Sequence, residues 1–303
     1  MANIFITGGS GLLGSNLAKM AILKFNDVYS NFLNHYVQIE GVTFNKLDLS
    51  NPAECDYINT LRPDYIIHCA ALTNLDYCEK HPDEAYQHNV LATKNMIDIA
   101  NKCGSKFIFI STDSVFDGNR GNYSEKDATN PISIYAKTKY DAENIVINSN
   151  LESIVVRTTI FGWNIQNKYS LAEWMLNKLE NKENFPAIED IFFTPLLVNE
   201  LATMLFKLIE IDAKGIIHLG SNNRVSKLEF AHQIAKVFEL DSSVISPTSK
   251  TEMEFLAHRG KDTSLKSKYA EKILKQEMPT VRDNIFQMKN LRDSGFVSDL
   301  KSY

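Results

Sequence analysis

The apolar positions of the first 160 residues form short continuous runs separated by stretches with helical spacing. Runs of this length are typical of buried strands, and the stretches between them are long enough for crossover helices. This alternation predicts βαβ units and an α/β fold with a doubly wound, mostly parallel sheet. The expected strands are 3–7, 27–33, 42–47, 65–69, 106–110 and 153–157, and the expected helices are 12–24, 82–104 and 133–148.

The pattern becomes less regular in the second half of the chain. Ser226 and Glu229 have the spacing of a capping box, which predicts a helix from there to about Phe238. We therefore expect a dinucleotide-binding Rossmann domain over residues 1–160. Residues 161–303 are expected to form mainly a smaller C-terminal substrate-binding lobe, with some elements returning to the Rossmann sheet. Further helices are expected at 170–181 and 198–211, and a short strand at 215–219.

Composition and charge narrow the class of protein. The 303 residues carry a formal net charge of -5, so no electrostatic attraction to nucleic-acid phosphates is expected. The first ten residues lack the basic start and long apolar run of a signal peptide, and no apolar stretch reaches the length of a membrane span. We therefore expect a cytoplasmic protein that binds neither nucleic acid nor membrane.

The four cysteines give no sign of a metal site. Cys55, Cys69, Cys78 and Cys103 form no CxxC pair, and no histidine cluster lies beside them. We expect free thiols of a reducing compartment, with Cys69 as a small core residue.

A glycine-rich segment follows the first expected strand. In Thr7–Gly14, the glycines Gly8, Gly11 and Gly14 are three residues apart. They allow a tight turn, close approach of a pyrophosphate to the backbone, and close packing of helix on strand. The N–H groups at the start of the following helix favour phosphate charge, although a tight turn without ligand is the alternative. The expected cofactor contacts here are Gly8, Ser10, Gly11, Leu12, Leu13 and Gly14.

Two other strand ends are expected beside this turn. Asp48 and Leu49 follow the third strand, and the Asp48 carboxylate is placed to accept from an adenine amino group. A helix N-cap or a solvated turn is the alternative role of Asp48. Ala70 and Ala71 follow the fourth strand and are also expected at the cofactor.

Proton-transfer chemistry is indicated by two further segments. Tyr135 and Lys139 are four residues apart and share one helix face, although about one such pair is expected by chance. Thr112 and Asp113 follow a strand end, where a hydroxyl can bond a substrate carbonyl or simply belong to a polar turn. Together with the glycine turn, these segments are stronger evidence for a dinucleotide-dependent active site than any one of them alone.

The combination resembles the extended short-chain dehydrogenases/reductases, and most closely the dTDP-4-dehydrorhamnose reductase group. Gly260 and Ile160 depart from that group, which commonly has Pro and Trp there, and this leaves the substrate open. The resemblance covers nearly the whole chain. Its motifs are Thr7–Gly14, 70–73, Asp76, Glu79, Asn89, 111–118, Tyr135–Lys139 with Glu143, 157–159, 215–221 and 259–265.

The resemblance implies hydride transfer between NADP(H) or NAD(H) and a sugar carbonyl. Tyr135 would donate the proton, and Thr112 would bond the same carbonyl oxygen. Lys139 would hold the nicotinamide ribose and lower the pKa of the Tyr135 phenol from its ordinary value of about 10. The implied substrate contacts are Thr112, Asp113, Ile160 and Arg259.

Several alternatives stay open at this stage. The leading interpretation is a reductase of a 4-keto-6-deoxy nucleotide sugar that serves polysaccharide precursor synthesis. An epimerase or dehydratase of the same superfamily would use the same Tyr/Lys pair. A non-catalytic NADP-binding regulatory subunit, like the β subunit of methionine adenosyltransferase, is a third. Residues 32–36 contain neither an acidic residue nor an arginine that would select NAD or NADP, and we slightly favour NADP. The resemblance also permits a homodimer.

Overall fold

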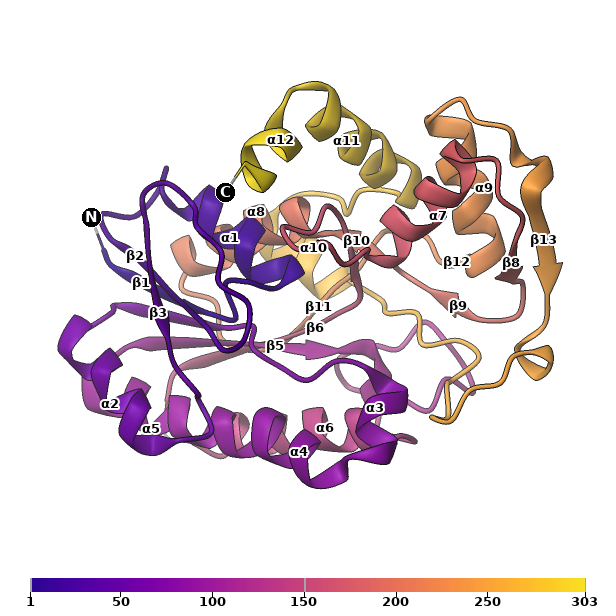
Figure 1. Cartoon of the computed structure of the whole chain (residues 1–303). Coiled ribbons are helices and arrows are strands. Elements are labelled where there is room, and N and C mark those ends of the chain that lie inside the picture. The colour runs from indigo at the N-terminus through magenta and orange to yellow at the C-terminus, as the bar shows by residue number, and fades with distance from the viewer. Residues whose placement is uncertain (1, 150, 303) are drawn as a thin grey trace.

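A parallel β-sheet with helices on both faces forms the centre of the computed structural model, which describes residues 2–149 and 151–302 (Figure 1). Within these residues the sheet has seven strands in the order β11-β6-β5-β4-β1-β2-β3, and every neighbouring pair is parallel. The predicted doubly wound fold is therefore confirmed. The strands are β1 (Ile4–Thr7), β2 (Val28–Phe32), β3 (Val42–Lys46), β4 (Tyr65–His68), β5 (Lys106–Thr112), β6 (Ser153–Thr158) and β11 (Gly215–Leu219).

Alternating side chains on the strands build two separate hydrophobic cores. On β1, Ile4 and Ile6 face one core, whereas Phe5 faces the other. The first core lies under α1 (Leu12–Ala21) and α8 (Val198–Glu210), and the second under α2 (Pro52–Leu61), α5 (Ala92–Cys103) and α6 (Ile134–Ile147) (Figure 1). Helices thus cover both faces of the sheet and exclude water from them, as is usual for a parallel sheet.

The second half of the chain adds smaller elements at one end of the sheet. The capping box of Ser226 and Glu229 is present, and it opens α9 (Lys227–Val237) as predicted. Strand β11 returns to the main sheet beside β6, while the domain boundary at residue 160 stays a prediction. The other elements are β7 (Ile160–Phe161), α7 (Leu171–Glu180), β8 (Phe185–Ile188), β9 (Phe192–Phe193), β10 (Leu196–Leu197), β12 (Val225–Ser226), β13 (Ile245–Thr248), α10 (Lys268–Leu274), α11 (Val281–Asp293) and α12 (Phe296–Lys301).

Some element boundaries differ from those predicted. The helix expected over 82–104 is α4 (Pro82–Tyr86), a π-helical turn (Gln87–Leu91) and then α5, which ends at the left-handed Gly104. The first helix ends at Ala21 instead of residue 24. The periodicity did not predict α2 or α3 (Leu75–Lys80), whose first turns are capped by asparagine side chains. None of the helices among the described residues is long and apolar enough to cross a membrane.

The glycine turn after β1 is held by a very close approach between backbones. Gly8 has a φ of +68°, a backbone conformation that residues with a side chain rarely adopt. A Cβ atom on Gly14 would lie 2.2 Å from the carbonyl oxygen of Gly8, so the start of α1 packs directly on the turn. Only a residue without a side chain fits at position 14.

We predict that Gly14→Ala lowers the free energy of unfolding by about 3 kcal/mol, because the added methyl group collides with backbone that cannot move aside. The matched control is Gly104→Ala. Gly104 also has positive φ, but a Cβ there meets no atom within 4 Å, so a cost of about 1 kcal/mol is expected. Urea unfolding measures both. Equal losses in the two variants would contradict the close-packing argument.

Candidate active site

A cavity of about 840 Å³ opens at the carboxyl ends of β1, β4, β5 and β6. Parallel sheets bind ligands at this edge, where the strand order reverses between β1 and β4. Every residue predicted at the cofactor or in proton chemistry lines this cavity. They are Gly8, Ser10, Gly11, Leu12, Leu13, Gly14, Asp48, Leu49, Ala70, Ala71, Thr112, Tyr135 and Lys139, joined by Asp113 and Ile160.

The glycine turn is tied to the end of β4 through Thr7. The Thr7 hydroxyl oxygen accepts from the backbone N–H groups of Cys69 and Ala70, both at 2.9 Å, and is 2.8 Å from Nδ1 of His68. On the other side, the Gly8 N–H donates to the side chain of Asn31. Gly11 begins α1 without a side-chain cap, which leaves the first N–H groups of the helix to face the cavity.

Tyr135 and Lys139 lie at the start of α6, on the face that lines the cavity. Ser133 caps this helix by accepting from the N–H of Ala136. Both side chains are buried, and the Lys139 ammonium lies 4.1 Å from the ring centroid of Phe109. Burial lowers the pKa of Lys139 to about 8, and the Glu143 carboxylate opposes this shift.

The expected lowering of the Tyr135 pKa is wrong for this structure. Burial is the largest influence on the phenol and raises its pKa, because a phenolate loses hydration in this environment. A hydrogen bond with the Thr112 side chain acts in the opposite direction, and the charge of Asp113 adds to the rise. Tyr135 is therefore a neutral phenol at neutral pH.

Thr112 lines this cavity, and its neighbour Asp113 lines both this cavity and a second one. The Thr112 hydroxyl donates to Asp113 Oδ1 at 3.1 Å, and Thr263 donates to Asp113 Oδ2 at 2.8 Å. Burial raises the pKa of the Asp113 carboxyl, and these hydrogen bonds and the charge of Lys227 oppose the rise. Asp113 therefore connects the end of β5 to the C-terminal half of the chain.

The second cavity, of about 400 Å³, shares Leu75, Asp113, Ser114 and Thr159 with the first. Its wall is mostly apolar and includes Trp174 and Phe193 from the second half. Arg259, predicted at the substrate, lines this cavity and not the first. Its guanidinium forms an ion pair with Asp76 at 3.2 Å.

Asp48 lines the first cavity and also forms a local turn. Its Oδ1 accepts from the backbone N–H of Ser50 at 2.9 Å and from the Ser50 hydroxyl at 2.7 Å. Asn51, not Asp48, caps the following helix. Among the alternatives for Asp48, the N-cap is therefore wrong, and the turn and the cavity position are compatible with each other.

Sequence reasoning gave no role to a buried ion pair beneath Lys139. Arg157 Nη2 donates to Glu143 Oε2 at 2.7 Å and Arg157 Nε donates to Glu143 Oε1 at 3.0 Å, while the Ser111 hydroxyl donates to Oε1 as well. Glu143 follows Lys139 by four residues on α6 and, like Arg157, belongs to the family motifs, but neither signal shows that the two side chains pair. The paired carboxylate thus fixes the helix face that carries Lys139.

The donor set of the first cavity fits a dinucleotide. It offers a glycine turn, uncapped N–H groups and a cationic side chain, all suited to phosphates and ribose hydroxyls. Within residues 2–149 and 151–302, no group of three His, Cys, Asp or Glu side chains is placed to hold a metal ion. Cys55, Cys69, Cys78 and Cys103 are free thiols, and Cys69 is only partly buried.

Comparison with known proteins identifies the family. The chain matches the RmlD substrate binding domain family over residues 1–292. It belongs to this family. It is 34% identical over 254 residues to the methionine adenosyltransferase 2 subunit beta of Bos taurus, covering 80% of this chain and 74% of that protein.

Two solved structures show the same architecture. A hypothetical dTDP-4-dehydrorhamnose reductase from Sulfolobus tokodaii is 31% identical with a TM-score of 0.81, covering 92% of this chain and 97% of that one. A dTDP-4-dehydrorhamnose reductase from Bacillus anthracis in complex with NADP is 26% identical with a TM-score of 0.85, covering 95% and 99%. The chain has the extended short-chain dehydrogenase/reductase fold that its motifs indicated.

We predict that Glu143→Gln lowers the free energy of unfolding by about 3–5 kcal/mol, because it leaves the Arg157 charge buried without a counter-ion. The matched control is Glu152→Gln. Its exposed ion pair with Lys214 is expected to contribute less than about 1 kcal/mol. Guanidinium unfolding monitored by circular dichroism measures both. A small loss in Glu143→Gln would show that the buried pair does not hold this part of the site.

Proposed function

We propose that this protein is an NAD(P)H-dependent reductase of a 4-keto-6-deoxy nucleotide sugar. The main support for this proposal is that the cavity lined by the glycine turn is also lined by side chains from two other elements. These side chains are Thr112, Tyr135 and Lys139. Family membership and the NADP complex of a structural relative support an NAD(P)-dependent oxidoreductase. A role in polysaccharide precursor synthesis follows from this substrate class.

Each end of the cavity suits a different part of the cofactor. The glycine turn and the start of α1 would hold the diphosphate, and Asp48 and Leu49 would lie at the adenine. Lys139 would bond the nicotinamide ribose. When bound there, the reduced nicotinamide supplies a hydride to the substrate carbonyl. Residues Asn31, Leu33 and Asn34 at the end of β2 line the cavity without an acid or arginine, so they select neither NAD nor NADP by charge.

Proton delivery is the task of the protein itself. A carbonyl that accepts hydride develops negative charge on oxygen, which needs a proton and hydrogen-bond donors. Tyr135 would donate its phenolic proton, and the Thr112 hydroxyl would donate to the same oxygen in exchange for its bond to Asp113 Oδ1.

The second cavity would receive the nucleotide part of the substrate. Its apolar wall suits a base, and the cations Lys227 and Arg259 suit a diphosphate. Arg259 would have to exchange its ion pair with Asp76 for a phosphate contact. Asp113 lines both cavities, and Ile160 lines the first. Both residues would contact the sugar.

A regulatory subunit is the second candidate function, favoured by the 34% identity to methionine adenosyltransferase 2 subunit beta. Such a protein would bind NADP without turnover. An epimerase or dehydratase is the third, since it would use the same tyrosine and lysine but regenerate its cofactor. A homodimer and a cytoplasmic location stay predictions.

We predict one NADPH oxidised per molecule of a nucleotide 4-keto-6-deoxy sugar reduced, measured by loss of absorbance with product analysis. Tyr135→Phe should lower kcat by about 10²–10⁴-fold, because the proton donor is lost, while the Kd for NADPH stays nearly unchanged. Tyr140→Phe, on the same helix but outside the cavity, is the matched control.

Each other outcome points to a different function. Substrate conversion without net NADPH loss would favour the epimerase or dehydratase. NADPH binding without turnover of any such sugar, together with co-purification of a synthetase, would favour the regulatory subunit. Turnover by Tyr135→Phe at a near wild-type rate would remove the proposed role of the phenol.

The affinity for NADPH should fall as pH rises above about 8. Lys139 has a pKa of about 8 in the folded protein, so its ammonium is present below that pH and is lost above it, together with its attraction for the cofactor. Kd measured by fluorescence titration between pH 6 and 9.5 tests this. The alkaline loss should persist in Tyr135→Phe and disappear in Lys139→Met. A pH-independent Kd in the wild type would contradict the ribose contact.

A further inference from the structure

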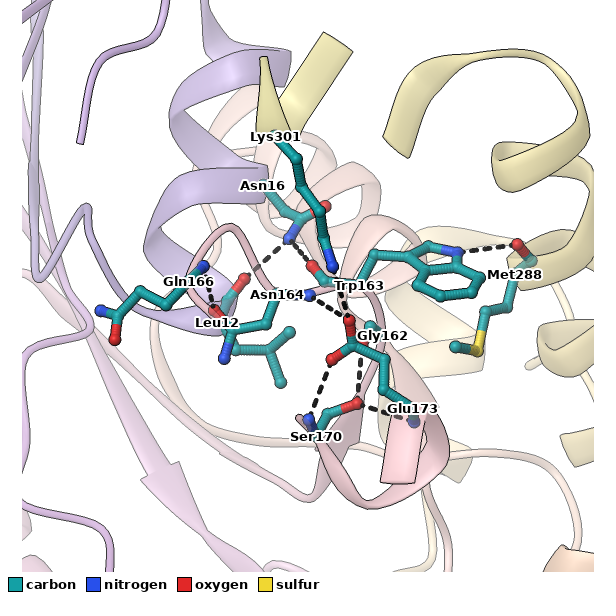
Figure 2. A network of polar contacts seen from close by, with 10 residues as sticks. All are labelled: Leu12, Asn16, Gly162, Trp163, Asn164, Gln166, Ser170, Glu173, Met288 and Lys301. Carbon is teal, nitrogen blue, oxygen red and sulfur yellow. Dashed lines mark hydrogen bonds and ion pairs between the residues drawn. The ribbon is translucent and has the colours of Figure 1, made fainter. Parts of the chain in front are cut away.

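A segment from the second half of the chain crosses the glycine turn. Residues 162–170, here called the strap, connect β7 to α7 (Figure 2). From the strap, Gln166 Nε2 donates to the carbonyl oxygen of Ser10 at 2.5 Å. Gln166 also lines the first cavity, where it is the one described lining residue that comes from beyond Ile160. The proposed cofactor side of the cavity is therefore not built from residues 1–160 alone.

The start of the strap is fastened to α1. Asn16, a fully buried residue of that helix, donates through Nδ2 to the carbonyl oxygens of Leu12 and Trp163, at 2.8 and 2.9 Å. The indole N–H of Trp163 donates to the carbonyl oxygen of Met288 on α11 at 2.9 Å (Figure 2). Neighbouring elements thus hold this end from two sides.

A buried carboxylate fastens the two ends of the strap to each other. Glu173 Oε1 accepts from the N–H of Asn164 at 3.1 Å, and Oε2 accepts from the N–H of Ser170 at 2.9 Å. The Ser170 hydroxyl donates to the carbonyl oxygen of Gly162 at 2.7 Å, and Lys301 on α12 forms an ion pair with Glu173 at 3.3 Å (Figure 2). The strap is therefore a fixed loop that presents Gln166 from its middle.

The Gln166 carboxamide has hydrogen-bonding capacity left for a ligand. Its NH₂ group carries two donors, and the bond to Ser10 uses one of them. Ser10, Gly11 and Leu12 line the same cavity, and the start of α1 there has no side-chain cap. The Gln166 carboxamide thus lines the same cavity as the backbone donors that suit an anionic oxygen.

We propose that Gln166 is a cofactor-positioning residue, and that the strap completes the diphosphate subsite of the dinucleotide by adding a donor opposite the glycine turn. This inference rests on the proposed binding of NAD(P)H in the first cavity. It extends that site to the C-terminal half of the chain. Gln166 holds the turn through Ser10 and bonds a phosphate oxygen through its second N–H.

The experiment measures the Kd for NADPH and NADH directly, without substrate, by fluorescence titration at low and high salt. Gln166→Ala should raise the Kd by roughly tenfold, the typical effect of losing one hydrogen bond to a charged group. Gln166→Glu keeps the shape but places a carboxylate beside the diphosphate. It should raise the Kd more, and most at low salt, because salt screens charge repulsion.

Asn167→Ala is the matched control, since Asn167 is the exposed neighbour of Gln166 on the strap. It should leave the Kd unchanged, and all three variants should unfold at the wild-type temperature. Kd values for Gln166→Ala and Gln166→Glu within twofold of wild type would overturn the inference. A loss of NADPH affinity in Gln166→Glu that does not depend on salt would also overturn the inference, because Gln166 would then only hold the glycine turn.

Failure of the proposed function gives a different result. If the wild-type protein binds neither NADPH nor NADH, the dinucleotide site itself is wrong. If the wild type binds and the Gln166 variants bind equally well, only the role of the strap is wrong.

Discussion

Parallel pairing of the central strands is the constraint on which the whole site depends. Thr7 at the end of β1 pairs with His68 at the end of β4, and Thr112 at the end of β5 pairs with Thr158 at the end of β6. Because all four strands run in the same direction, their last residues reach one edge together. Segments that are 44 to 151 residues apart in sequence thereby line one cavity, and a register shift in either pair would separate them.

A chain of buried hydrogen bonds then links the glycine turn to the helix that carries Tyr135. Thr7 Oγ1 already accepts from two N–H groups, so its proton goes to His68 Nδ1, and Nε2 of this neutral ring donates to Thr93. Burial lowers the pKa of His68 to about 3, consistent with a neutral ring. Thr93 donates to the carbonyl oxygen of Asn89, whose side chain bonds both Leu72 and Thr138 on α6. The π-helical turn places Asn89 in this linking position.

Periodicity predicted the seven strands of the central sheet and the helices α1, α5, α6, α7 and α8, because burial on a sheet leaves a period in the sequence. It missed α2 and α3, whose starts are set by the side chains of Asn51 and Asn74, and it missed the C-terminal helices α10, α11 and α12. The motif residues that line the first cavity were predictable because they follow strand ends or, for Tyr135 and Lys139, share one face of a helix. The ion pairs Glu143–Arg157 and Asp76–Arg259, and the contact of Gln166 with Ser10, were not. They join distant segments through side-chain directions, which no local pattern encodes.

Burial at the site sets the protonation states of its two titratable side chains. Desolvation raises the pKa of Tyr135, so the phenol is neutral and able to donate a proton. Burial lowers the pKa of Lys139 to about 8, and the Glu143 carboxylate, itself paired with Arg157, opposes this shift. The buried ion pair therefore bears on the charge of Lys139 as well as on its position.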